Sequence, residues 1–187
     1  MVRAAYDLFS TRGLSVPMTA IAEQAGVAVQ TLYFTFHTKT RLLMEAHDYA
    51  VLGEDGLEPQ QQAAYLRIRE TTDQRSVILA LVEVGTNIAQ RIGPLLWHMQ
   101  AAVEDPEITA ALAHRERLRV DGYAEIVDEL LRRGSLREGV DRQAALDVLL
   151  ALTSSALILF FLRERGWTLE RWAAWTVETL CERLLPA

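Results

Sequence analysis

The stretch AGVAVQTLYFTFHTK, residues 25–39, combines a glycine with aromatic residues, hydroxyls and a lysine, and it contains no acid. Lys39 is the only lysine of the chain, whose 19 Lys and Arg residues are otherwise all arginines. Glycine readily adopts the left-handed conformation that separates two consecutive helices. The stretch therefore predicts two short helices joined at Gly26, as in a helix-turn-helix.

The residues on both sides of this stretch have helical apolar spacing, and strand patterns are nearly absent. We expect helices over about 1–12, 18–25, 29–34 and 38–51, the last of them starting near Thr38 or Thr40, each of which is a possible cap. A small core behind the third helix is expected from Leu8, Phe9, Ile21, Ala22, Val27, Leu32 and Phe36. This core would fix the third helix against the second and leave its other face outside.

The rest of the chain is also predicted to be helical. GEDGLEP, residues 53–59, is a break in composition and predicts a loop. The later helices are expected over about 60–71, 76–92, 95–103, 106–133, 141–165 and 168–185. The second of them starts at Asp73 or Ser76 and is stopped by Gly93-Pro94. Asp141 and Thr168 are expected to cap the last two. We therefore predict an all-α fold, with a helix-turn-helix domain in residues 1–50 and a larger helical domain in residues 51–187.

Charge is distributed unevenly along the chain. Residues 1–50 contain four cations and four acids, whereas the remaining residues contain 15 cations and 21 acids and supply the whole net charge of −6. A polyanion would be repelled by the acidic part. Any contact with nucleic acid is therefore expected in the first fifty residues.

One apolar segment, AALDVLLALTSSALILFFL at residues 144–162, is about long enough to span a membrane. It contains Asp147 and a Thr-Ser-Ser step, and charged residues 163–165 follow it. A helix that is apolar all round is also expected where one side meets its own domain and the other meets a partner subunit. With one cysteine, Cys181, and no secretory signal, we expect a cytoplasmic protein without a membrane span.

The segments AAYDLFSTRG, IAEQAGV and TLYFTFHTKTRLLMEA resemble the N-terminal domain of TetR-family transcriptional regulators. The family pattern is matched in order and spacing at Ala5, Leu8, Phe9, Gly13, Ile21, Ala22, Ala25, Gly26, Val27, Thr31, Leu32, Tyr33, Phe36, Lys39, Leu42 and Leu43. The resemblance implies a homodimer that binds a palindromic double-stranded DNA operator through the helix at about 28–34. It also implies a small-molecule effector.

Side-chain chemistry suggests roles within that helix. Gln30 offers a bidentate amide for an adenine edge, and Val29 an apolar contact for a thymine methyl. The hydroxyls of Thr31 and Tyr33 suit phosphate oxygens, as does Lys39, and in the family the matching residues commonly hold the DNA backbone. The full set of candidate DNA-binding residues is Thr19, Ala28, Val29, Gln30, Thr31, Tyr33, Phe34, His37, Thr38 and Lys39.

Alternatives stay open for several of these residues. Tyr33 could pack on the first helix, Phe34 could pack against the first or fourth helix, and Thr19 could be merely solvated. Ala28 stands where the family usually has a Ser or Thr cap worth about 1 kcal/mol, and Pro17 replaces a hydroxyl-bearing cap. The family also has a basic segment upstream of the first helix, so an upstream-extended protein is expected to bind DNA more tightly.

A helix-turn-helix reads few base pairs, so such proteins pair on two half-sites about 34 Å apart. The apolar helices 144–162 and 168–185 are expected to form the dimer contact, unless they only complete the monomer core. The candidate interface residues are Leu149, Leu152, Ala156, Leu159, Trp172, Trp175 and Thr179. By resemblance, a ligand cavity is expected between the middle helices. Its candidate residues, each of which could instead be an ordinary core or surface position, are Asn87, Trp97, His98 and Tyr123.

An enzyme is not expected, because the four histidines lie far apart and no metal motif or glycine-rich phosphate loop occurs. We likewise expect no cofactor and no metal. The sequence predicts a ligand-responsive regulator, expected to be a repressor released by a small hydrophobic or amphipathic effector. The alternative is a helical small-molecule or protein-binding adapter that has lost specific operator binding.

Overall fold

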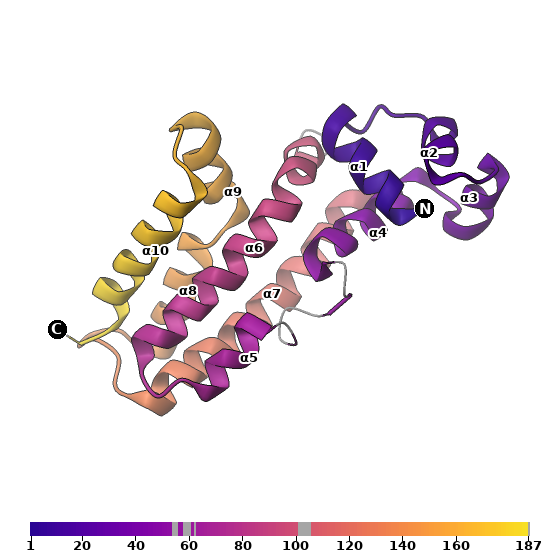
Figure 1. Ribbon diagram of the computed structural model, residues 1–187. Coiled ribbons are helices and arrows are strands. Elements are labelled where there is room, and N and C mark those ends of the chain that lie inside the picture. Colours follow the sequence, from indigo (N-terminus) through magenta and orange to yellow (C-terminus); the bar gives the residue numbers. More distant parts are fainter. Residues whose placement is uncertain (54–55, 58–60, 62, 101–105, 187) are drawn as a thin grey trace. The chain divides into compact units, whose positions relative to one another are not determined.

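The computed structural model describes residues 1–53, 56–57, 61, 63–100 and 106–186. All the regular elements in these ranges are helices, which confirms the predicted all-α fold (Figure 1). The chain divides into two compact units. Unit 1 comprises residues 1–57 and 90–114, and unit 2 comprises residues 58–89 and 115–187. Unit 1 thus includes residues 90–114 in addition to the N-terminal helices.

Unit 1 contains four N-terminal helices, which are α1 (Val2–Arg12), α2 (Met18–Ala25), α3 (Val29–Phe36) and α4 (Lys39–Leu52). Helix α1 packs against α4 and α2, and α2 packs against α3. Six of the seven residues predicted for this core are buried, because their helical spacing places them on one side of each helix, and the seventh, Val27, is half-buried in the turn after α2. The fully buried members of this core are Ala5, Phe9, Ile21, Leu32, Leu42, Ala46, Leu95 and Met99.

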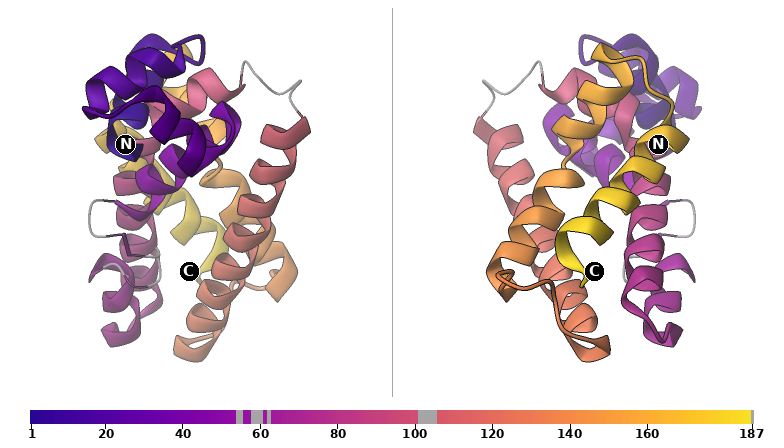
Figure 2. Two further views of the ribbon diagram at one scale, coloured as in Figure 1. Left: turned by 90° about the vertical axis from the view of Figure 1, so that its right-hand side faces the viewer. Right: turned by 90° about the vertical axis from the view of Figure 1, so that its left-hand side faces the viewer.

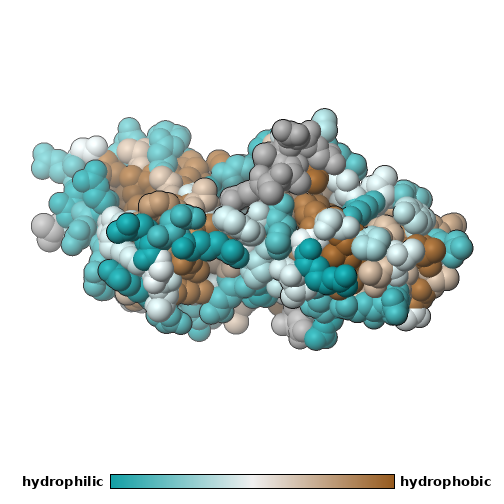
Figure 3. All heavy atoms as spheres, turned by 90° about the horizontal axis from the view of Figure 1, so that it is seen from above, coloured by the Kyte–Doolittle hydropathy of each residue, from teal (hydrophilic) through white to brown (hydrophobic). Residues whose placement is uncertain are grey.

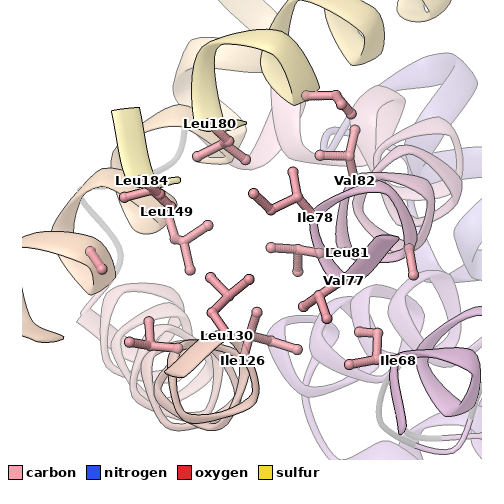
Figure 4. Close-up of a cluster of buried hydrophobic side chains, with 14 of the residues drawn as sticks. Ile68, Val77, Ile78, Leu81, Val82, Ile126, Leu130, Leu149, Leu180 and Leu184 are labelled. Carbon is pink, nitrogen blue, oxygen red and sulfur yellow. The ribbon is translucent and has the colours of Figure 1, made fainter. Parts of the chain in front are cut away.

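Unit 2 is built on longer helices. These are α5 (Ala63–Glu70), α6 (Gln74–Gln100), α7 (Pro106–Arg133), α8 (Arg142–Leu152), α9 (Ser155–Leu159), the π-helix η2 (Phe160–Glu164) and α10 (Leu169–Leu184), with the last turns of α6 and the first of α7 assigned to unit 1. Helix α10 packs on α8 (Figure 2). Side chains from α5, α6, α7, α8 and α10 meet in one apolar core, labelled in Figure 4 from Ile68 to Leu184.

Helix α6 continues through Gly93-Pro94, so the predicted stop there is wrong. Proline removes one backbone hydrogen bond and usually ends or kinks a helix. Leu95 and Met99 lie just beyond it and are both fully buried in the core of unit 1. Burial of this apolar face offsets the lost hydrogen bond, since each buried side chain contributes about 1.5–3 kcal/mol. The predicted helix 95–103 is therefore part of α6 up to residue 100, and residues 101–103 lie outside the described ranges.

The predicted continuous helix over 141–165 is also wrong. It ends at Leu152, and α9 begins at Ser155. The Thr153 hydroxyl donates to the Leu149 carbonyl over 2.7 Å, and the Ser154 hydroxyl accepts from the Leu157 amide over 3.3 Å. Ser and Thr side chains compete with helical hydrogen bonds in this way, which explains the break at the polar step.

Three helix caps suggested by the sequence are confirmed. Thr38 accepts from the Arg41 amide at the start of α4, and Asp141 accepts from the Ala144 amide at the start of α8. Thr168 accepts from the amide of the residue three positions later at the start of α10. Each side chain satisfies a backbone N–H that has no partner inside its helix.

Candidate nucleic-acid interface

The turn between α2 and α3 is closed by Gly26, which has the left-handed angles φ 67° and ψ 32°. The Gly26 amide donates to Glu23 over 3.1 Å, and the Val27 amide donates to Ala22 over 3.0 Å. These two bonds form a Schellman motif, which ends α2 and turns the chain into α3. A side-chain carbon added at Gly26 would meet no neighbouring atom within 4 Å. The backbone conformation, rather than space, therefore requires glycine.

Helix α3 has one buried face and one exposed face. Leu32 is fully buried and Phe36 is 7% exposed, so the two anchor the helix in the core of unit 1. Gln30 and Thr31 are exposed, Val29 is half-buried, and the candidates Thr19 and Ala28 beside the helix are exposed as well.

The two aromatic residues in the middle of α3 face outward. Tyr33 is 50% exposed and Phe34 is 85% exposed. The interpretation that Phe34 packs against the first or fourth helix is therefore wrong, because a packed ring would be covered. An isolated apolar side chain on a surface is ordinary, but two neighbouring aromatic rings on the exposed side of a short helix suit a binding surface.

The turn from α3 into α4 has an unusual conformation at His37. His37 has φ 60° and ψ −49°, and it is the only non-glycine residue with positive φ among the described residues. The Thr38 amide donates to the Phe36 carbonyl over 2.6 Å, which makes this a γ-turn centred on His37. Both His37 and Thr38 are exposed beside α3. A side chain in such a region costs on the order of 1–3 kcal/mol and is held by the structure around it.

Lys39 has a structural partner that the sequence did not predict. Its ammonium group donates to the Leu14 carbonyl and lies 5.9 Å from the centre of the Phe9 ring. Burial lowers the pKa of Lys39. The side chain thus ties the start of α4 to the loop between α1 and α2. An ammonium has three donors, so this bond leaves others for a phosphate.

The two missing caps are as expected, since neither Ala28 before α3 nor Pro17 before α2 provides a side-chain cap. The sequence reasoning missed Arg41, whose exposed side chain lies in the first turn of α4, beside the capping Thr38. Its signal was a second cation two positions after Lys39. The exposed side chains of α3 and the residues 37–41 together form a surface that offers amide, hydroxyl, aromatic and cationic groups.

The four candidate ligand-binding residues do not belong to one unit. Asn87 and Tyr123 are in unit 2, whereas Trp97 and His98 are in unit 1. Asn87 and Trp97 are exposed. His98 packs on the corner after α1, where its Nδ1 lies 3.3 Å from the position of a side-chain carbon added to Gly13.

Tyr123 has the surroundings most consistent with a binding site. It is half-buried, and the Arg119 guanidinium lies 5.2 Å from its ring centre. Arg119 also contacts the Leu150 carbonyl and the Thr153 hydroxyl, both at 3.5 Å.

On α10, the buried Trp172 Nε1 and Thr176 Oγ1 have no hydrogen-bond partner among the described residues.

A hollow of about 700 Å³ lies on the surface of unit 2, between α5 and α7. Six of its seven lining residues are charged, namely Arg69, Glu125, Asp128, Glu129, Arg132 and Arg133, and the seventh is Thr71. Glu129 pairs with Arg132 and Arg133, and Asp128 pairs with Arg142. None of the four candidate ligand residues lines this hollow, whose charges already neutralise one another. Among the described residues, no three His, Cys, Asp or Glu side chains gather as a metal site would require.

The candidate dimer residues fall into two groups. Leu149 and Trp172 are fully buried in the core of the single chain, and Leu159 is 8% exposed. These three support the helices from inside and cannot offer a surface to a partner, which corrects their assignment. The remaining candidates are exposed or half-buried, and they are Leu152, Ala156, Trp175 and Thr179.

Comparisons with known proteins agree with this geometry. Residues 1–46 match the family model of the bacterial regulatory proteins, tetR family. No curated protein matches the chain significantly. Many solved structures share its fold, including a transcriptional regulator from Saccharomonospora viridis in complex with choline (TM-score 0.76, 18% identity, covering 98% of this chain and 94% of that one). Another is the regulator FadR from Bacillus subtilis in complex with stearoyl-CoA (TM-score 0.74, 17% identity, covering 96% and 95%). A third is NalD, the secondary repressor of the MexAB-OprM efflux pump in Pseudomonas aeruginosa (TM-score 0.68, 21% identity, covering 98% and 93%).

Proposed function

We propose that this chain, whose residues 1–46 match the family model of the tetR-type bacterial regulatory proteins, is a DNA-binding transcriptional regulator with the following mode of action. The protein is a repressor that binds a palindromic operator as a homodimer. A small hydrophobic or amphipathic effector releases it from the DNA. Its domains are the helix-turn-helix region of residues 1–50 and the ligand-binding and dimerisation region of residues 51–187.

The observation that carries the proposal is the two-faced helix α3. Buried Leu32 and Phe36 fix the helix, while Gln30, Thr31 and Tyr33 remain exposed and chemically suited to DNA. Gln30 reads an adenine edge, and Val29 lies at the rim of the contact. A helix presented in this way enters the major groove of a duplex.

Two residues of α3 and the residues that follow it supply the contacts to the DNA backbone. Thr31 and Tyr33 donate hydrogen bonds from their hydroxyls to phosphate oxygens. At the start of α4, Thr38 donates from its hydroxyl and Lys39 from its ammonium group. Arg41 joins this set because its guanidinium is exposed on the same first turn. Backbone contacts fix the register of the helix on the duplex, while base contacts such as that of Gln30 choose the sequence.

The homodimer is supported by uncovered apolar surface in unit 2. The most apolar stretch of 18 residues within Arg142–Glu164 has a mean hydropathy of 2.2, yet only 33% of that stretch is buried in the single chain. By length and composition it is the one candidate membrane span among the described residues, which is weak support for a membrane. Apolar atoms lie at the surface near α9 and α10, at the left of Figure 3, and Phe160 is 47% exposed. A second copy covering Leu152, Ala156, Trp175 and Thr179 removes this surface from water.

We propose that the effector binds inside unit 2, where Tyr123 and polar groups of α10 are the candidate contacts. Trp172 Nε1 and Thr176 Oγ1 are one helical turn apart and lack partners there, so a polar group gains bonds without displacing any. The half-buried Tyr123 supplies an aromatic face, and Asn87 stays a candidate at the rim. The similar regulator in complex with stearoyl-CoA carries an amphipathic ligand, which agrees with this class of effector, whereas the ligand of the other regulator, choline, is a small polar cation.

The test begins with selection of duplexes from a random-sequence DNA library by the purified protein. Enrichment of a palindromic duplex, followed by its release with an amphipathic molecule from a small-molecule panel, is the expected result. Failure to enrich any duplex above random DNA refutes the proposal and favours the adapter. Enrichment of a site without dyad symmetry refutes the homodimeric mode.

A salt titration of the selected duplex tests the backbone contacts. Lys39→Met removes one cation from each of two subunits, so the slope of log affinity against log salt becomes shallower by about two. Arg117→Met removes an exposed cation from unit 2 and is expected to leave the slope unchanged. Thermal unfolding of both variants separates this effect from loss of the bond between Lys39 and Leu14. An unchanged slope in a folded Lys39→Met protein contradicts the phosphate contact.

A further inference from the structure

We infer that Phe34 reads the methyl group of a thymine in the major groove and so directs α3 to an A·T pair. This inference rests on the proposed function, because it assigns a base to the helix that enters the DNA. Neither the family match nor the similar structures assign a role to this residue.

Phe34 is the residue of α3 that points most directly away from the protein. It is 85% exposed, which is the largest exposure among the described large apolar residues. At about 100° per residue, it lies on the opposite side of the helix from the midpoint between Leu32 and Phe36. Those two side chains anchor the helix in the core of unit 1. Whatever the exposed face of α3 approaches therefore meets the Phe34 ring first.

The chemistry of the ring limits what it can recognise on DNA. Phenylalanine has no hydroxyl, so it cannot donate to a phosphate oxygen as Thr31 or Tyr33 can. The thymine C5-methyl is the apolar group that a natural base pair presents in the major groove. Contact with it removes both the ring and the methyl from water, which is favourable for each.

Gln30 lies one helical turn before Phe34 and is also exposed. Residues four apart lie about 5–6 Å from each other on the same face of a helix. Gln30 and Phe34 thus form a single ridge with an amide and an aromatic ring. An A·T pair offers the complementary groups, since adenine presents N6 and N7 and thymine presents its methyl. The ridge fits one A·T pair, or two adjacent ones, better than G·C pairs.

The test uses the full-length protein and the duplex that it selects from a random-sequence library. Each thymine is replaced in turn by deoxyuridine, which lacks only the methyl group. We expect one thymine in each half-site whose replacement weakens wild-type binding by about fourfold, the value of one buried carbon group. In Phe34→Ala the thymine and deoxyuridine duplexes should bind equally well. Phe34→Leu should give a ratio between those of the wild type and the Ala variant.

Leu79→Ala is the matched control, since it also removes an exposed large apolar side chain, but from α6 in unit 2. It should keep the wild-type ratio. The inference is overturned if no thymine matters to the wild type, or if the ratio is the same for Phe, Leu and Ala. It is also overturned if Phe34→Ala changes only the self-association of the free protein, measured by sedimentation. If no duplex is selected at all, the proposed function is refuted, and this inference, which rests on it, is refuted as well.

Discussion

Replacing Arg91 by alanine should loosen the end of α4 without affecting unit 2. Arg91, on α6, donates from Nε to the Ala50 carbonyl over 2.8 Å and from Nη2 to the Val51 carbonyl over 3.1 Å. Both acceptors belong to the last turn of α4, whose carbonyls have no partners within the helix. A cation at this end also interacts favourably with the helix dipole.

The size of the effect follows from these contacts. A hydrogen bond from a charged donor contributes about 1.5–3 kcal/mol, and we use the lower value because Arg91 is half-buried. Two such bonds give a loss of about 3 kcal/mol. Local opening of the α4 end should then become roughly a hundredfold more frequent.

Hydrogen exchange of the native protein, followed by mass spectrometry of its peptides, measures this opening. Peptides from the second half of α4 should exchange about a hundredfold faster in Arg91→Ala, whereas peptides from α10 in unit 2 should not change. Gln90→Ala, at an exposed neighbouring position, should match the wild type, and Arg91→Lys should give an intermediate rate. An increase in exchange rate below about fivefold in α4, or an equal increase in α10, would refute the conclusion that Arg91 stabilises the end of α4.

Two further predictions concern the turn after α3 and the core of unit 2. His37→Gly should raise the free energy of unfolding, measured in urea, by about 1 kcal/mol, because glycine adopts φ 60° without strain. Thr35→Gly inside α3 should instead lower it by about 0.3 kcal/mol, because glycine is a poorer helix former than threonine. A loss of stability in His37→Gly would show that the histidine side chain holds the turn. Burial, followed by the Glu125 carboxylate, raises the pKa of Tyr65 to about 12 from 10.0, so the unfolded chain loses this proton at a lower pH than the folded protein does. The stability advantage of the wild type over Tyr65→Phe, measured by urea unfolding, should therefore shrink as the pH rises from 10 towards 12, and a constant difference would contradict the raised pKa.

Local sequence was sufficient for the helix-turn-helix. Gly26 ends α2 because few other residues adopt its left-handed angles, and this depends only on neighbouring residues. The four-residue spacing of Leu32 and Phe36 places both on one face of α3, which is buried. The polar Gln30 and Thr31 lie outside that face and are exposed. Capping residues such as Thr38 act on amides three positions away, so their effects were predictable too.

Tertiary structure decided the features that depend on residues far apart in the chain. Helix α6 passes Pro94 because Leu95 and Met99 find an apolar core built from residues near the N-terminus. Lys39 bonds to the Leu14 carbonyl, a partner 25 positions away, which no local pattern indicates. Trp172 is apolar enough for either a core or an interface, and only the packing of the folded chain places it fully inside. Interactions between neighbouring residues determine the backbone conformation and the direction of a side chain. The partners of that side chain depend on the whole fold, because the burial that stabilises the protein brings together segments that are far apart in the sequence.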